Sequence, residues 1–564
     1  MNSFNLMDRP WISVRKTDGE IDTVSILNLF ENSKHYSSLA TELPLTDFVL
    51  LRILLAILHR SWEDSKSEDF ATALDHWEEK WKASSLLDTD VLAYCEKVHA
   101  RFDIMDASAP FFQVADLHTA NNEWKPISLL FPDITEPGSL FTMATDLQSA
   151  SPAQTARMLI TTMAWDFSGI KSGAVGDPRV KGGRGYPIGT GWAGWMGATI
   201  VEGKNLHETI LLNYIAMENF DGQATQGSDE DLPPWEKAPL DEKPVKIAHY
   251  SGGLDPENFA SGPIELFTWQ QRRIRVKWDN GLAVGCLVAN GDPVGHVVQQ
   301  GVEQMTPWRF SEPQSKKFKT PRYMPFQLQQ GRALWRSLNG ILPNSEPPKV
   351  QKGIGQGSDL QKPASTVSWI SLLLREKALA ETYPIHIRMM SMEYGANSSS
   401  YANIIADHIT VPSALLNEEQ VELQKSAQLA VSMTDRVAYA LIRYYKNLRA
   451  AVGQREVSDA EIEDVRSRFY SEVDPGFRKW LLQLQPGVSL NEQMSLWQQF
   501  LKKLARDVAR ALLSLQSPQV WHGRVVDDRQ INAATAERFF ESALREAIGS
   551  ESSQEAPLEG ANNE

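Results

Sequence analysis

Residues 167–197 read FSGIKSGAVGDPRVKGGRGYPIGTGWAGWMG, and the rest of the chain is best interpreted outward from them. Glycine tolerates positive φ angles and lets another backbone approach closely, so its density here predicts a long loop without helix or strand. Long loops inside compact domains are usually functional. The loop carries cations at Lys171, Arg179, Lys181 and Arg184. It is therefore a candidate site for a polyanion, and the alternative is a surface loop with solvated charges.

The totals describe a globular protein of 564 residues, long enough for two or three domains. With 42% hydrophobic and 23% charged residues, the chain has ample material for a core. Its net charge of −15 argues against nucleic acid covering the whole surface. A local basic groove remains compatible with that charge, because what matters is where the cations lie.

Two cysteines, Cys95 and Cys286, lie far apart and form no CxxC motif. A disulfide framework and a cysteine zinc site are both unsupported, which favours a reducing, cytoplasmic location. The first residues, MNSFNLMDRPW, lack the pattern of a signal peptide. The longest apolar run, residues 48–58, is interrupted by Arg52 and is too short to span a membrane. We expect no membrane association.

The first 410 residues mix helical and strand patterns and predict one large α/β domain that includes the glycine-rich loop. The expected elements are a hairpin within 10–27, helices over 48–60 (capped by Thr46 or Asp47), 69–82, 88–101 and 151–165, and a hairpin over 274–289. The last of these turns at Asn280-Gly281, the preferred two-residue hairpin turn. Four cations make this hairpin basic, and we expect them to form a solvated face. They are Arg272, Arg273, Arg275 and Lys277.

Residues 411–549 are helical throughout. Ser458 and Ser489 each precede a glutamate by three residues, as in a capping box, and Asn417 and Asn532 can cap two further helices. Amphipathic helices joined by short turns predict a four-helix bundle. The fold class is thus α+β, a mixed N-terminal domain followed by an all-α bundle. The final residues, 550–564, are polar and acidic and predict a disordered tail.

Motifs of common active sites are missing. The eleven histidines form no HExxH pattern, and neither a GxSxG nucleophile elbow nor a phosphate-binding P-loop occurs. Residues 189–194 match GxGxxG, but no strand precedes them as a dinucleotide site requires. We predict no catalytic residue, no metal and no cofactor. An enzyme whose residues converge only in three dimensions remains the first alternative.

Several stretches in their order resemble one family, the large subunit of the type I-E CRISPR surveillance complex Cascade (the CasA family). They are residues 9–12, 51–59, 109–113, the glycine-rich loop, 287–292, 305–309, the 392–400 turn and the terminal helices. The resemblance runs from about residue 4 to 549. No single motif is diagnostic, and the case rests on order and spacing.

This resemblance implies a non-catalytic subunit of a crRNA-guided antiviral complex. Such a subunit recognises the protospacer-adjacent motif (PAM) in double-stranded DNA, helps to start unwinding and R-loop formation, and recruits the helicase–nuclease. Its partners would be target DNA, crRNA, the other Cascade subunits and that nuclease. In such systems base pairing reads the target, whereas protein reads the short flanking motif.

The resemblance also implies functional roles for particular residues of this sequence. The family's PAM-reading glycine loop matches Ser168, Gly169, Lys171, Ser172 and Gly173, with Lys171, Lys181 and Arg184 as phosphate contacts; a family glycine falls at Ser168. The family's wedge, which enters the duplex beside the PAM, matches Gly395, Ala396, Asn397, Ser398 and Ser399. Its glutamine corresponds to Ser398 or Ser399, which favours insertion of backbone over a bulky side chain.

A third family loop, which contacts the crRNA 5′ handle and a neighbouring subunit, matches Phe141, Thr142 and Met143; an ordinary packing loop is the alternative. For the function as a whole, the second alternative is a scaffold or RNA-binding subunit without direct PAM readout. Loss of PAM discrimination on changing residues 168–173 would argue against that alternative.

Overall fold

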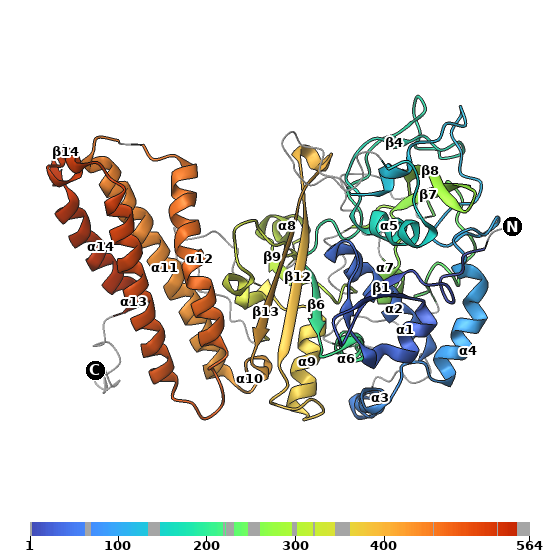
Figure 1. Cartoon of the computed structure of the whole chain (residues 1–564), viewed down its shortest axis with the longest axis horizontal. Coiled ribbons are helices and arrows are strands. Elements are labelled where there is room, and N and C mark those ends of the chain that lie inside the picture. Colours follow the sequence, from blue (N-terminus) through green and yellow to red (C-terminus); the bar gives the residue numbers. More distant parts are fainter. Residues whose placement is uncertain are drawn as a thin grey trace. The chain divides into compact units, whose positions relative to one another are not determined.

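The computed structural model describes residues 3–62, 69–132, 147–217, 220, 230–245, 260–295, 302–319, 322–343, 361–454, 456–526 and 528–549. The expected crRNA-contacting residues Phe141, Thr142 and Met143 and the 550–564 tail lie outside these ranges. Contacts divide the chain into two units: Met1–Gln330 with Asn339–Ile409, and Gly331–Leu338 with Thr410–Glu564 (Figure 1). In the described part of the chain, no helix is both long and apolar enough to cross a membrane.

Helix α2 (Pro44–Ser61) forms the centre of the N-terminal unit, and its residues from Leu45 to His59 are buried. It packs against α4 (Thr89–Val98), α5 (Pro152–Trp165) and α7 (Pro263–Phe267). The predicted cap at Thr46 or Asp47 is wrong. The helix begins earlier, because the fixed φ of proline suits the first turn of a helix.

The described part of this unit also includes three small sheets and a long hairpin. Their strands run in the orders β2-β1-β3, β10-β9-β11 and β13-β12-β6, and β7 pairs with β8. The bounds are β1 Ile12–Lys16, β2 Ile21–Val24, β3 Tyr36–Leu39, β6 Ala198–Glu202, β7 Arg272–Asp279, β8 Leu282–Asn290, β9 Trp308–Phe310, β10 Tyr323–Pro325, β11 Gln361–Lys362, β12 Ile385–Tyr394 and β13 Tyr401–Val411. The long strands β12 and β13 form a hairpin whose turn is Gly395–Ser400 (Figure 1).

Further helices complete this unit. They are α1 Ile26–Asn32, α3 Phe70–Lys82, α6 Leu206–Leu212, α8 Glu312–Phe318 and α9 Ser365–Arg375. The helix α3 agrees with the prediction, and so does α5, which Ser151 caps through Gln154 in a complete capping box.

The β7–β8 hairpin differs from the prediction in its charges. Arg272 and Arg273 are buried and paired with Asp166 and Asp292, respectively. The expected solvated basic face is therefore wrong for these two positions, because Arg272 meets an acid that follows α5 and Arg273 meets an acid that directly follows the hairpin. Lys277 alone among the four cations is exposed.

The C-terminal unit is a bundle of long helices that lie side by side (Figure 1). Its elements are α10 Ser413–Leu416, α11 Val421–Ala451, α12 Asp459–Leu481, α13 Leu490–Ser514, β14 Arg524–Val526, β15 Arg529–Ile531 and α14 Ala533–Ile548. The predicted fold class, a mixed α/β part followed by a helical C-terminal region, is confirmed. The predicted cap Asn417 is wrong, since α11 begins after Gln420.

A short segment from the middle of the chain joins this bundle. Trp335 stacks on Phe477 with ring centroids 4.2 Å apart. Its indole Nε1 donates to Asp474 at 2.9 Å. These contacts explain why Gly331–Leu338 clusters with the C-terminal unit, which the sequence did not predict.

Changing Ser458 to alanine is expected to lower the free energy of unfolding of the bundle by about 1 kcal/mol. The Ser458 hydroxyl accepts from the backbone N–H of Glu461, whose carboxylate in turn accepts from the backbone of Ser458. Ser471→Ala is the matched control, because Ser471 lies exposed inside the same helix, where alanine has the better propensity. Equal losses in urea denaturation of both variants would contradict a capping role.

Candidate nucleic-acid interface

The glycine-rich segment contains a small hairpin rather than an unstructured loop. Strands β4 (Lys171–Ser172) and β5 (Arg184–Gly185) pair antiparallel, and the prediction of no strand is wrong. Gly182 and Gly183 have φ angles of 59° and 73°. Positive φ at both central residues is what a two-residue type I′ turn requires, and this glycine pair closes such a turn between Lys181 and Arg184, which exchange two backbone hydrogen bonds. The turn leads the loop that connects the two strands into β5.

Close backbone packing inside this hairpin depends on Gly173. A Cβ added there would lie 2.3 Å from the carbonyl oxygen of Gly183. The hairpin thus needs a glycine at this position. Lys181 and Arg184 flank the turn, and both are exposed. Within the described residues, neither forms an ion pair, so both cations face solvent at the hairpin tip.

Lys171 lies in a different environment from the one predicted. Its side chain is 6% exposed, and Nζ lies 2.7 Å from Oδ2 of Asp166. The same ammonium lies 3.9 Å from the centroid of the Phe167 ring. The prediction that Lys171 contacts a phosphate finds no support in this geometry, because the ammonium is buried and already paired.

Asp166 is the acid that holds two cations. Its Oδ2 also accepts from Nε of Arg272 at 2.5 Å. Burial alone would raise the pKa of Asp166, but the charges of Lys171 and Arg272 outweigh burial and hold that pKa below its usual value. Burial lowers the pKa of Lys171, and the negative charge of Asp166 offsets part of this decrease. The cluster thus buries two cations against one carboxylate.

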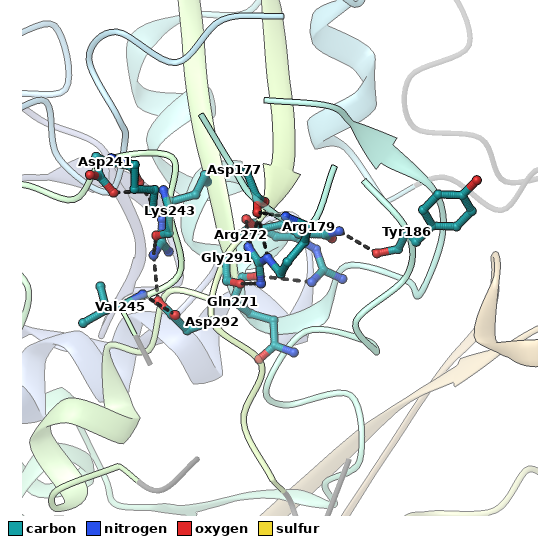
Figure 2. A network of polar contacts seen from close by, with 12 residues as sticks. Asp177, Arg179, Tyr186, Asp241, Lys243, Val245, Gln271, Arg272, Gly291 and Asp292 are labelled. Carbon is teal, nitrogen blue, oxygen red and sulfur yellow. Dashed lines mark hydrogen bonds and ion pairs between the residues drawn. The ribbon is translucent and has the colours of Figure 1, made fainter. Parts of the chain in front are cut away.

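A second polar network fixes the base of the hairpin to the end of β8. Figure 2 shows Arg179 between Asp177 and Gly291. Arg179 Nη1 donates to the carbonyl oxygen of Gly291 at 2.8 Å, and the Asn290 side chain donates to the carbonyl oxygen of Tyr186 at 2.6 Å. Arg179 is therefore structural, and the loop cations that remain for a ligand are Lys181 and Arg184.

The turn between β12 and β13 is short, small and partly left-handed. Asn397 and Ser398 have φ angles of 56° and 54°, a region that residues other than glycine rarely adopt. Ala396, Asn397 and Ser399 are exposed. The Ser399 hydroxyl donates to the carbonyl oxygen of Ala396 at 2.8 Å, so it serves the turn itself.

The structure brings this turn and the glycine-rich hairpin together. The backbone N–H of Ser168 donates to the carbonyl oxygen of Ser398 at 2.7 Å. Between the two segments lies a cleft of about 850 Å³. Its walls include Lys125, Leu129, Ile170, Ser172, Arg184 and Ser399. Two stretches more than 200 residues apart in the sequence thus form one surface feature.

The cleft combines small polar residues, exposed apolar side chains and cations. Ile170 is 57% exposed and Leu129 is 44% exposed, whereas Glu123, an acid of the wall, lies near Lys125. Over the ranges that the structure describes, no group of three or more His, Cys, Asp or Glu residues could hold a metal ion. The arrangement suits a polyanion that also has an apolar surface, because the cations of the cleft can meet its charges and the exposed apolar side chains can meet that surface.

Sequence reasoning missed the residues that support the cleft, namely Asp166, Arg272, Tyr394 and Tyr401. Tyr394 and Tyr401 bracket the turn, and burial raises the pKa of both. A signal existed for Asp166, because it is an acid placed directly between a helix and a positive segment. No signal in the sequence linked it to Arg272.

The GxGxxG match at residues 189–194 has a packing role. The backbone N–H of Gly191 donates to the carbonyl oxygen of Asp166 at 2.7 Å, and that of Ala193 donates to Ala164 at 2.8 Å. The segment therefore packs on the end of α5, and it leads into strand β6 and not into the helix that a dinucleotide site requires. The interpretation that this match is not a dinucleotide site agrees with the geometry.

Comparisons with known proteins point to one family. The family model "CRISPR-associated protein Cse1" matches residues 5–508. The curated relative "CRISPR-associated protein CasA/Cse1" of Thermus thermophilus is 26% identical over 352 residues. That match covers 61% of this chain and 61% of the relative, so it spans less than two thirds of either protein.

Solved structures extend the similarity to nearly the whole chain. The crystal structure of Thermobifida fusca Cse1 matches with a TM-score of 0.84 and 34% identity, covering 97% of this chain and 98% of that one. A chain of a "CRISPR RNA-guided surveillance complex" matches at 16% identity with a TM-score of 0.63, covering 91% and 99%. The latter similarity concerns the fold alone.

Proposed function

The chain belongs to the Cse1 (CasA) family, the large subunits of type I-E Cascade, and from this premise we propose that it recognises the PAM in double-stranded target DNA. In this proposal it is a non-catalytic subunit that helps to start unwinding and R-loop formation and recruits the helicase–nuclease. Its crRNA contact, through Phe141, Thr142 and Met143, belongs to the same proposal.

One observation carries the proposal: the hairpin and the turn meet at one cleft, joined by the Ser168–Ser398 hydrogen bond. Small residues allow backbone groups to approach base edges in the minor groove, which is only about 6 Å wide. The exposed cations Lys181 and Arg184 lie on the hairpin at positions suited to phosphates. Phosphate contacts set register, and base-edge contacts set specificity.

The turn would act as the wedge beside the motif. Its exposed residues are small, and the Ser399 hydroxyl is bonded within the turn. Insertion would therefore rely on the left-handed backbone at Asn397 and Ser398 and not on a bulky side chain. A stiff protruding backbone can disfavour re-pairing of the strands because it occupies the space of a base step.

Changing Gly173 to alanine tests the proposal. The new Cβ would collide with the carbonyl oxygen of Gly183 and force β4 and β5 apart. We expect about a tenfold loss of affinity for a matched duplex with the favoured PAM, the magnitude of one lost base contact. The measurement is binding by the complex reconstituted with crRNA and the other subunits, titrated with duplexes that differ only at the PAM.

Lys277→Ala serves as the control, because Lys277 is exposed on β7 and outside the cleft. If the Gly173→Ala variant bound both duplexes with the same affinities as the wild-type protein, the hairpin could not be the element that recognises the PAM. If the wild-type complex itself failed to discriminate between PAMs, the scaffold or RNA-binding alternative would be favoured.

A further inference from the structure

Residues 165–167, named here the anchor segment, contact both elements that border the cleft. They join the end of α5 to the glycine-rich hairpin. On the side of the turn, the Tyr394 hydroxyl donates to the carbonyl oxygen of Trp165 at 2.8 Å. The rings of Phe167 and Tyr401 meet edge to face with centroids 5.2 Å apart. Both ends of the turn are thus fixed to the anchor segment.

On the side of the hairpin, Lys171 is the side chain that ties β4 to the anchor segment. Its ammonium pairs with Asp166 and lies over the ring of Phe167. The hairpin and the turn are therefore held by the same three residues, and the Ser168–Ser398 hydrogen bond closes the connection between them.

The charge on Lys171 is not required to neutralise Asp166. Arg272 already neutralises Asp166 and also donates to the carbonyl oxygens of Phe167 and Gly189. A buried ammonium pays for desolvation, and an apolar side chain of similar length would fill the same space. The lysine at this position is therefore better explained by the geometry that it imposes than by stability.

We propose that Lys171 is a positioning residue for DNA recognition: its ion pair with Asp166 holds the hairpin in register with the turn, so that both reach the duplex as one preformed unit. This inference rests on the proposed function. It differs from the family-based expectation, in which Lys171 touches a phosphate. The two roles predict different dependences on salt and on PAM sequence.

The test compares Lys171→Met with Lys181→Ala in the reconstituted complex. Methionine keeps the unbranched chain over Phe167 and leaves the Asp166–Arg272 pair intact. For Lys171→Met we expect the ratio of affinities for favoured and disfavoured PAMs to fall about fivefold, the lower end of one lost base contact. The slope of log K against log salt should stay at the wild-type value.

Lys181→Ala should show the opposite pattern. Loss of one phosphate contact reduces the magnitude of that slope by about 0.9 and leaves the PAM ratio unchanged. Hydrogen exchange gives a second readout, because the Ser168 amide should lose protection in Lys171→Met when its bond to Ser398 loosens. Lys277→Met, on an exposed lysine outside the cleft, should match wild type in all three measurements.

The outcomes separate the inference from the proposed function. A smaller salt slope with an unchanged PAM ratio for Lys171→Met would make Lys171 a phosphate contact and overturn the inference alone. Equal loss on both duplexes at an unchanged slope would indicate a purely structural role and overturn it as well. A PAM ratio in Lys171→Met equal to that of wild type would also overturn the inference, whereas failure of the wild-type complex to discriminate between PAMs would contradict the proposed function. Lys171→Gln, also neutral and of similar length, replaces Lys171→Met should that variant fold poorly.

Discussion

Replacing Glu303 with glutamine is expected to lower the free energy of unfolding of the N-terminal unit by about 3–5 kcal/mol. Arg52 and Glu303 form an ion pair in the core, with side chains 0% and 3% exposed. Nη1 of Arg52 donates to both carboxylate oxygens, at 2.9 and 2.8 Å. Glutamine preserves the shape but leaves a guanidinium in the interior without a counter-charge, and desolvating such a group is expensive.

The surroundings of Arg52 cannot replace the carboxylate. The guanidinium lies 4.4 Å from the ring centroid of Trp192 and 4.3 Å from that of Phe267. A desolvated cation over an aromatic face gains about 2 kcal/mol, less than a buried charge loses without its partner. In the described part of the chain, Nε and Nη2 of Arg52 have no hydrogen-bond partner, so no second acceptor takes over.

The double variant Arg52→Met, Glu303→Leu is the decisive control. Replacing a buried ion pair with apolar side chains is often neutral, so the double variant should recover most of the lost stability. Hydrogen exchange of α2 amides measures the free energy of opening of this unit by itself. A loss in Glu303→Gln below 1 kcal/mol, or a double variant less stable than the single one, would contradict this account.

Local signals in the sequence predicted local structure well. Ser151 marks the start of α5, Ser458 marks the start of α12 through its predicted capping box, and Asn280-Gly281 marks the β7–β8 turn. In each case the physical cause lies within a few residues of the element. The predicted start of α2 was wrong, and its cause is equally local. Thr46 is a good cap by residue type, but the helix already begins at Pro44, two residues earlier.

Long-range pairing explains what the sequence could not predict. The strands β4 and β5 exist because Lys171 and Gly185 pair across the loop 173–183, although both lie in a segment with the composition of a loop. Arg272 is buried because Asp166, 106 residues away, accepts from it. Charge type alone cannot distinguish such a residue from a solvated one, since its partner is specified by the fold.

The candidate cleft shows the same limit. The family resemblance named the hairpin and the turn separately, at Gly173 and at Ser398, but neither composition nor spacing indicated that they share a hydrogen bond through Ser168. It also placed Lys171 on a phosphate by its type and position in the loop. The structure instead buries that ammonium against Asp166, so only the exposed cations of the hairpin keep that role.

Reversing both exposed cations, in the double variant Lys181→Glu, Arg184→Glu, is expected to weaken binding of duplex DNA by about 100-fold at low salt. A hydrogen bond to a charged group contributes about 1.5–3 kcal/mol, and two at the lower end amount to about 3 kcal/mol. Every 1.4 kcal/mol changes affinity about tenfold. Both side chains are exposed, and for the described residues no ion pair competes for them.

The loss should be equal for duplexes with favoured and disfavoured PAMs, because phosphates carry no sequence information. The slope of log K against log salt should decrease in magnitude by about 1.8, so the variant and wild type converge as salt rises. Reversal of Arg506 and Arg510 on α13 is a control of equal charge change, since both are held by acids of the bundle, Glu541 and Asp507. If that control weakened binding as strongly, the effect would come from net charge alone, and the hairpin tip would lose its assignment as the phosphate-binding element.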